Sequence, residues 1–186
     1  MPLDLDLDLV DPLFRIRDLE PTDEPSVLAL FGAAEDWFTA TTGQPAAPGD
    51  VQSLYYVLPE GAAFDDKAIL VIESEGRIVG LIDAVLRHPT ASTCSVGMFL
   101  LHPAHRRRGI GSRAVSLLLG ELARRGHTEV VASVAVELRP GRAFLTSLGF
   151  TFDLGAAGPL TTANRNPGPG ERAPVRARLH LPAGPR

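Results

Sequence analysis

The chain has 186 residues, of which 45% are apolar and 22% charged, a composition typical of one soluble globular domain. Its single cysteine, Cys94, excludes an internal disulfide, and no cysteine–histidine spacing suggests zinc, so we expect no metal site. The acidic N-terminus and the short apolar runs disfavour a signal peptide and a membrane span. We therefore expect a reduced, cytoplasmic protein without a membrane partner.

The charges are distributed unevenly along the chain. Residues 1–101 hold 5 basic and 17 acidic side chains, whereas residues 102–186 hold 13 basic and 5 acidic ones. All but one of the basic residues are arginine, which suits forked contacts with phosphate. Two interpretations stay open: an arginine-rich proteome with ordinary surface charge, or an anionic ligand held by the second half and a cationic substrate near the first.

Apolar periodicity predicts the order of elements in the first half. Residues 1–12 form a ragged acidic leader or an edge strand, and residues 13–186 are expected to form one domain. Residues 51–58 suit either helix or strand. The other elements expected here are strands at 13–19, 67–74, 77–87 and 93–101, and helices after Pro21 and over 35–41.

The second half begins with a loop at 102–108 and an amphipathic helix that starts at Gly111. A Gly/Pro-rich stretch over 155–174 is expected to be a long loop within the domain. The remaining elements expected are a strand at 129–136, a short helix at 141–148, a strand start at 149–154 and a final strand at 175–181.

The segment from Val96 to Ser112, VGMFLLHPAHRRRGIGS, carries the clearest chemistry. A buried strand leads through an arginine- and glycine-rich turn into a helix N-terminus, whose unpaired N–H groups attract phosphate. Gly109 and Gly111 let the backbone approach a ligand closely, and neighbouring arginines add charge-assisted hydrogen bonds. These residues predict a pyrophosphate-binding turn.

Other phosphate-binding motifs fit this segment poorly. A dinucleotide fingerprint needs a third glycine where Ala114 stands, and a P-loop needs a lysine, whereas the only lysine is Lys67. The pattern [Q/R]-x-x-G-x-[G/A] fits Arg106 to Gly111. With the strand before it, the helix after it, and the run FLTSLGF at 144–150, the chain resembles the GNAT superfamily of acyl-CoA-dependent N-acyltransferases over residues 96–152.

The resemblance implies a fold and a co-substrate. The fold would be α/β, with a mixed, mostly antiparallel central sheet flanked by helices, and acetyl-CoA would bind where the strands at 93–101 and 129–136 diverge. The backbone N–H of Leu101 would polarise the thioester carbonyl. The residues that the resemblance assigns to cofactor binding are Phe99, Leu100, Leu101, Arg106, Arg107, Arg108, Gly109, Ile110, Gly111 and Ser112.

Two positions depart from the family pattern, and the acceptor side has one candidate base. Leu138 stands where the family often has a cofactor-contacting asparagine, and Leu145 stands where it often has a tyrosine that protonates the departing thiolate. Asp83 lies among apolar residues of a strand, so it is either a general base or ammonium holder at a pocket mouth, or a carboxylate satisfied by a buried partner.

We therefore expect an N-acetyltransferase that moves an acetyl group directly from acetyl-CoA to an amine of a small molecule or peptide. The alternative is a non-catalytic acyl-CoA-binding or sensing module, which the two departures favour. Three adjacent arginines without an aromatic platform do not predict a nucleic-acid partner. The sequence leaves the acceptor and the acyl chain open, and it allows a monomer or a homodimer.

Overall fold

The computed structural model describes residues 7–153 and 174–182. Except for Pro174, the Gly/Pro-rich loop predicted at 155–174 lies outside the described residues, as do residues 1–6 of the predicted leader.

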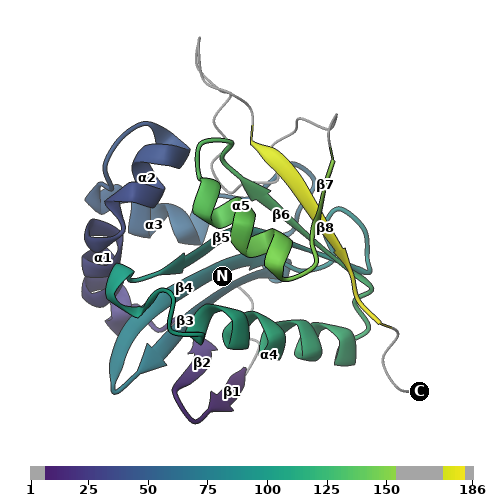
Figure 1. Ribbon diagram of the computed structural model, residues 1–186, viewed down its shortest axis with the longest axis horizontal. Coiled ribbons are helices and arrows are strands. Elements are labelled where there is room, and N and C mark those ends of the chain that lie inside the picture. The colour runs from purple at the N-terminus through teal and green to yellow at the C-terminus, as the bar shows by residue number, and fades with distance from the viewer. Residues whose placement is uncertain (1–6, 154–173, 183–186) are drawn as a thin grey trace.

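The described strands form one mixed sheet of order β1-β2-β3-β4-β5-β6-β8-β7 (Figure 1). Every neighbouring pair is antiparallel except β5 and β6, which are parallel. The mixed, mostly antiparallel sheet predicted from the sequence is thus confirmed. The strands are β1 (Asp8–Asp11), β2 (Phe14–Asp18), β3 (Lys67–Ser74), β4 (Arg77–Val85), β5 (Thr93–Leu101), β6 (Glu129–Val134), β7 (Thr151–Asp153) and β8 (Val175–His180).

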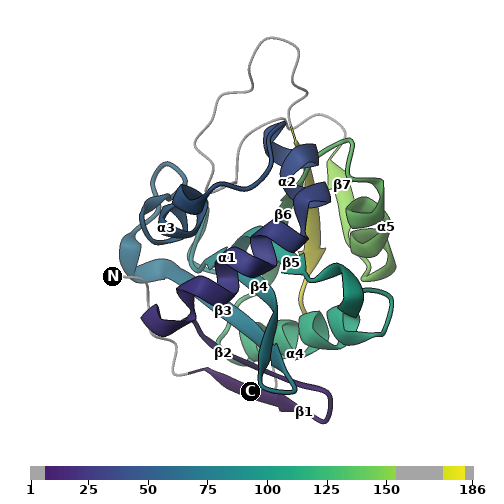
Figure 2. The same ribbon diagram turned by 90° about the vertical axis from the view of Figure 1, so that its left-hand side faces the viewer.

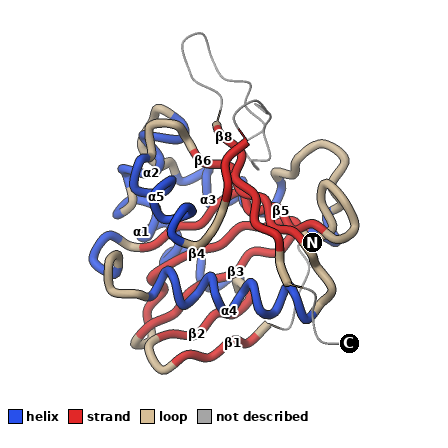
Figure 3. The backbone as a smooth tube through the Cα atoms, turned by 45° about the vertical axis from the view of Figure 1, so that its right-hand side comes forward, coloured by secondary structure: helices blue, strands red, loops and turns tan. Residues whose placement is uncertain are grey.

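Helices cover both faces of the sheet. On one face lie α1 (Glu24–Ala33), α2 (Glu35–Thr42) and α3 (Pro48–Tyr56), and on the other lie α4 (Ile110–Arg124) and α5 (Arg139–Ser147) (Figures 2 and 3). Three short 3₁₀ helices connect these elements: η1 (Pro21–Asp23), η2 (Phe64–Asp66) and η3 (Pro103–His105).

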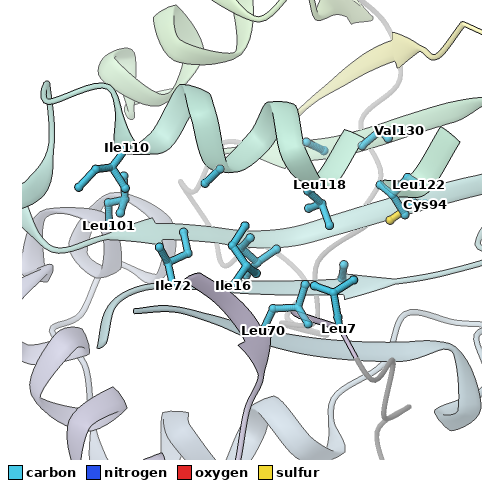
Figure 4. Close-up of a cluster of buried hydrophobic side chains, with 14 of the residues drawn as sticks. Leu7, Ile16, Leu70, Ile72, Cys94, Leu101, Ile110, Leu118, Leu122 and Val130 are labelled. Carbon is cyan, nitrogen blue, oxygen red and sulfur yellow. The ribbon is translucent and has the colours of Figure 1, made fainter. Parts of the chain in front are cut away.

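Strand alternation divides the core into two clusters, one on each face of the sheet. Ile16, Leu70 and Ile72 belong to the cluster under α4, together with Leu118 (Figure 4). On the opposite face, Leu81 and Leu100 are among the strand residues that pack against α1, α2 and α3. Because every central strand is buried on both faces, the helices are fixed at either side of the sheet.

Two sequence interpretations are refined by the structure. Residues 8–11 of the predicted leader form the edge strand β1, which pairs antiparallel with β2, so this part of the leader belongs to the sheet. Residues 48–56 are helical: Pro48 suits the first turn, and Val51 and Leu54, three residues apart, are both buried. Tyr56 is 74% exposed.

Candidate active site

A fork between β5 and β6 is the central feature of the site. The two strands pair in parallel only as far as Val96 and Ala132, whereas β5 continues to Leu101. A bulge at Gly97, where the register against β4 passes from Met98 directly to Val96, lies at the point of divergence. Bulges bend a strand and increase its twist, so the bulge accounts for the separation of the strands.

Alternate residues of β5 hydrogen-bond to β4, and the backbone groups of the residues between them face the fork. The His102 amide donates to the Val79 carbonyl of β4 at 2.8 Å. Because antiparallel pairs alternate between bonded and non-bonded residues, Leu100 also bonds to β4, while the backbone groups of Phe99 and Leu101 point to the opposite, forked edge. The backbone of Leu100, which was expected to contact the co-substrate, therefore faces β4.

The N-terminus of α4 presents uncapped amides beside this edge. Gly109, the N-cap residue, has φ +81°, and no side chain caps the helix. The Arg113 amide is bonded to the Gly109 carbonyl, so the amides of residues 110–112 precede the first helical hydrogen bond. A side chain at Gly109 would meet no atom within 4 Å. The open space and the positive helix end suit a phosphate group.

Gly111, in the first turn of α4, is closely packed. It is buried, and a Cβ there would lie 3.1 Å from Leu101 Cδ1 and 3.4 Å from Phe144 Cζ. The residue is therefore restricted by packing between α4, β5 and α5, and its missing side chain does not open the backbone to a ligand.

The three motif arginines differ in their environment. Arg107 and Arg108 are exposed, and Arg107 has φ +61°. Arg106 instead folds back: its Nε donates to the Leu101 carbonyl at 2.9 Å, and its Nη1 and Nη2 bind Asp36 of α2 at 2.5 and 3.0 Å. That hydrogen bonding lowers the pKa of Asp36.

The side chain of Arg106, which was expected to contribute to cofactor binding, contacts Leu101 and Asp36 in this structure. Its guanidinium bridges the end of β5 and the start of α2. It donates a hydrogen bond to the carbonyl of Leu101, the residue whose N–H faces the fork.

A hollow of about 560 Å³ adjoins the turn but lies away from the fork. It shares Arg108 and Ile110 with the turn, and its walls otherwise come from the β1–β2 hairpin, the β3–β4 turn and His105. Its lining is of mixed charge, since Arg15 and Arg108 face it together with the carboxylates of Asp11, Glu73 and Glu75. No residue of β5 or β6 lines it, so this hollow is separate from the fork.

The carboxylate of Asp83 has a buried partner. Its two oxygens lie 3.0 and 3.2 Å from Lys67 Nζ, which also donates to the Val57 carbonyl at 2.8 Å. Both side chains are fully buried. The geometry favours the structural interpretation of Asp83 and gives no support to an acceptor-side base in contact with solvent.

The two departures from the family pattern lie on α5 and at its start. Leu138 is the N-cap residue of α5, and Leu145 packs against the core under α4. Phe144 stacks on Phe99 with ring centroids 5.6 Å apart. Cys94 is buried, and burial raises the pKa of its thiol to about 12, so it stays protonated at neutral pH.

Three features of the site were not anticipated from the sequence. The Gly97 bulge had a usable signal, because a glycine inside a buried strand pattern often marks a bulge. The contact between Arg106 and Asp36 joins residues 70 positions apart and leaves no local signal. The positions of Ser133 and Arg176 at the fork, described below, depend on the pairing of β6 with β8.

Solved structures of several acetyltransferases share this fold. An acetyltransferase from Salmonella typhimurium that modifies the N-terminal serine of ribosomal protein L7/L12 matches with a TM-score of 0.71, 17% identity, and 94% and 98% coverage of this chain and that one. The ribosomal-protein-S18-alanine N-acetyltransferase from Escherichia coli matches with a TM-score of 0.62, 18% identity, and 91% and 94% coverage. Identities this low show the fold alone.

Sequence comparison identifies the family. The chain is 35% identical over 80 residues to L-2,4-diaminobutyric acid acetyltransferase from Wolinella succinogenes, a match that covers 43% of this chain and less than half, 46%, of that relative. The profile of the acetyltransferase (GNAT) family matches residues 32–150, which is well over half of the chain. The chain therefore belongs to the GNAT acetyltransferase family, as the resemblance predicted.

Two further findings concern only residues 7–153 and 174–182. None of the helices in these ranges is both long and apolar enough to cross a membrane. The same residues contain no group of three or more His, Cys, Asp or Glu side chains that could hold a metal ion.

Proposed function

We propose that this chain is an acetyl-CoA-dependent N-acetyltransferase that transfers the acetyl group directly to an amine. The observation that carries the proposal is the fork at Gly97, beyond which the edge of β5 is not paired with β6 and leads to the uncapped N-terminus of α4. An extended chain with amide groups suits the strand edge, and a pyrophosphate suits the helix end. Acetyl-CoA contains both parts.

Each backbone group at the fork then has a role. The N–H groups of Phe99 and Leu101 and the carbonyl of Phe99 would hold the pantetheine arm as an additional strand. The amides of residues 110–112 would bind the pyrophosphate. The Leu101 N–H would donate to the thioester carbonyl oxygen as negative charge develops on it, an effect often worth about 2.7–4 kcal/mol. Arg106 would keep that N–H in position through its bond to the Leu101 carbonyl.

The reaction needs two proton transfers. The neutral amine attacks the thioester carbon, the C–S bond breaks, the nitrogen loses a proton and the thiolate gains one. Because the Asp83 carboxylate is held by Lys67 and Leu145 has no acidic proton, we propose that water at the fork carries both protons. A direct transfer of this kind needs no enzyme nucleophile, which agrees with the raised pKa of Cys94.

The relative from Wolinella succinogenes supports an amine acceptor, because its name describes an acetyltransferase that acts on an amino acid with two amino groups. The replacement of the usual asparagine and tyrosine by Leu138 and Leu145 favours a second candidate, a module that binds acyl-CoA without turnover.

Thiol release separates the two candidates. The purified chain would be incubated with acetyl-CoA and an amine panel, and free CoA would be measured with a thiol reagent. The proposal expects release that depends on the amine and yields acetylated amine by mass spectrometry. Binding of acetyl-CoA without amine-dependent release would support the binding module, and the absence of any binding would contradict both.

A further inference from the structure

Two arginines lie on the same face of β8, but only one has anionic partners. Arg178 Nε lies 2.6 Å from Asp153, and its Nη1 lies 3.3 Å from Glu129. Arg176 lies directly opposite Asp153 in the β7–β8 register, yet that carboxylate binds Arg178. Among the residues that the structure describes, the Arg176 guanidinium has no hydrogen bond or ion pair, and its Nε is buried. An uncompensated, partly buried cation is costly.

The position of Arg176 places this cation at the fork. Arg176 pairs with Ser133 of β6, and Ser133 is the first β6 residue beyond the last β5–β6 pair, Val96 with Ala132. The Ser133 hydroxyl is also buried without a hydrogen-bond partner among the described residues. Residues directly opposite in an antiparallel pair have Cβ atoms about 5 Å apart on one face. The two side chains therefore leave neighbouring backbone positions on one face, and the Ser133 hydroxyl and the Arg176 Nε are both buried without a hydrogen bond among the described residues.

These two side chains lie on the face where an acceptor would approach. Val130 and Ala132 of β6 pack in the cluster under α4, so Ser133 lies on the opposite face, the one that carries α1, α2 and α3. The helix end proposed to bind pyrophosphate belongs to α4. A co-substrate held there reaches the fork from the α4 face, and the amine must attack from the other.

Within the described part of the chain, the charged groups near Arg176 have other partners or are cationic when protonated. The neighbouring ionisable group in the β4–β5 loop is His88, whose pKa is lowered first by burial and then by the charge of Arg176, against a smaller raising effect of Asp66, and Asp66 is itself paired with Arg87. Glu129 and Asp153 are both engaged by Arg178. An anion from outside the chain would satisfy Arg176 and Ser133 together.

We infer that Arg176, with Ser133, binds a carboxylate of the acceptor, so that the substrate class is amines that also carry a carboxylate, such as amino acids. This inference rests on the proposed function. A carboxylate matches the forked donors of a guanidinium and accepts a further hydrogen bond from a serine hydroxyl. The amine of the same molecule would then lie on the acceptor face of the fork.

Matched amines test the inference. Amine-dependent CoA release would be measured for lysine and lysinamide, ornithine and ornithinamide, and β-alanine and β-alaninamide. For at least one pair, the wild-type chain is expected to show kcat/KM roughly 10- to 100-fold higher for the carboxylate than for the amide, the range for hydrogen bonds to a charged group. Arg176→Gln should remove this preference, and Arg176→Lys should keep part of it. Arg124→Gln, at an exposed α4 position, is the control and should behave as the wild type.

The outcomes separate the inference from the function beneath it. Release with every amide as good as with its acid, or a preference that survives in Arg176→Gln, overturns the carboxylate site and leaves the acetyltransferase intact. Absence of release with every amine overturns the proposed function and the inference with it. The acetyl-CoA affinity of Arg176→Gln should stay within about threefold of wild type, and a larger loss would also overturn the inference, because it would assign Arg176 to the fold or the cofactor side.

Discussion

Replacing Asp83 by asparagine tests whether this carboxylate supports the fold or the chemistry. In the wild type, both members of the Lys67–Asp83 pair are fully buried, with oxygens 3.0 and 3.2 Å from Nζ. Asp83→Asn leaves a buried ammonium with its Val57 carbonyl but without its counter-ion. Breaking such a pair costs about 3–5 kcal/mol, which for a chain of this size lowers Tm by roughly 6–20 °C.

Denaturation and kinetics on the same preparations provide the assay. We expect Asp83→Asn to lower the free energy of unfolding by this amount, while kcat/KM per folded molecule stays within about twofold of wild type. The double variant Lys67→Met/Asp83→Leu should recover most of the stability, because an apolar pair of similar volume is often neutral or stabilising. A fall in kcat of about 10²-fold with unchanged Tm would refute this reasoning and restore Asp83 as a base.

Three further predictions concern the turn, α5 and the response to pH. Gly109→Val should abolish acetyl-CoA binding measured by calorimetry, because φ +81° disfavours valine and because the valine side chain would fill the open space. The control variant Gly120→Val, at an unobstructed α4 position, should bind normally. Equal affinity in both variants would contradict the placement of the pyrophosphate. Leu145→Tyr should keep or raise kcat if thiolate departure lacks a proton donor, and a fall in kcat with the fold intact would show that the ring obstructs the water path. Burial lowers the pKa of His127, so the unfolded chain binds a proton at this residue more readily than the folded chain. The free energy of unfolding should therefore decrease as pH falls below about 6.5. His127→Asn should reduce the slope of the free energy of unfolding against pH, measured by urea titrations, and an unchanged slope would show that His127 does not cause it.

The sheet and the order of elements could be predicted from the sequence because they depend on local patterns. Alternation in the strands and the three-and-four spacing in α4 are visible within short windows. The motif from Arg106 to Gly111 likewise lies in one segment, so the uncapped helix end could be placed from residue types alone. The divergence of β5 and β6 was expected only through the family resemblance.

Longer-range details could not be read in the same way. A regular hairpin about Glu75 and Gly76 would pair Asp83 with Ala68, on the face opposite Lys67. A register shift at Ile72 and Glu73 instead pairs Asp83 with Ile69, which brings Asp83 and Lys67 to one face. One irregular residue thus decides whether Asp83 can pair with Lys67, and the apolar pattern of the two strands does not predict this irregularity.

The amide exchange of individual residues with and without acetyl-CoA tests the central claim most directly, because the proposed contacts are made by backbone N–H groups. Residue-resolved NMR exchange should show slower exchange at Phe99, Leu101 and residues 110–112 when acetyl-CoA is added, with no change at residues 10–15 beside the hollow. Protection at residues 10–15 without protection at the β5 edge, or no protection anywhere at saturating acetyl-CoA, would contradict the assignment of the fork as the acetyl-CoA site.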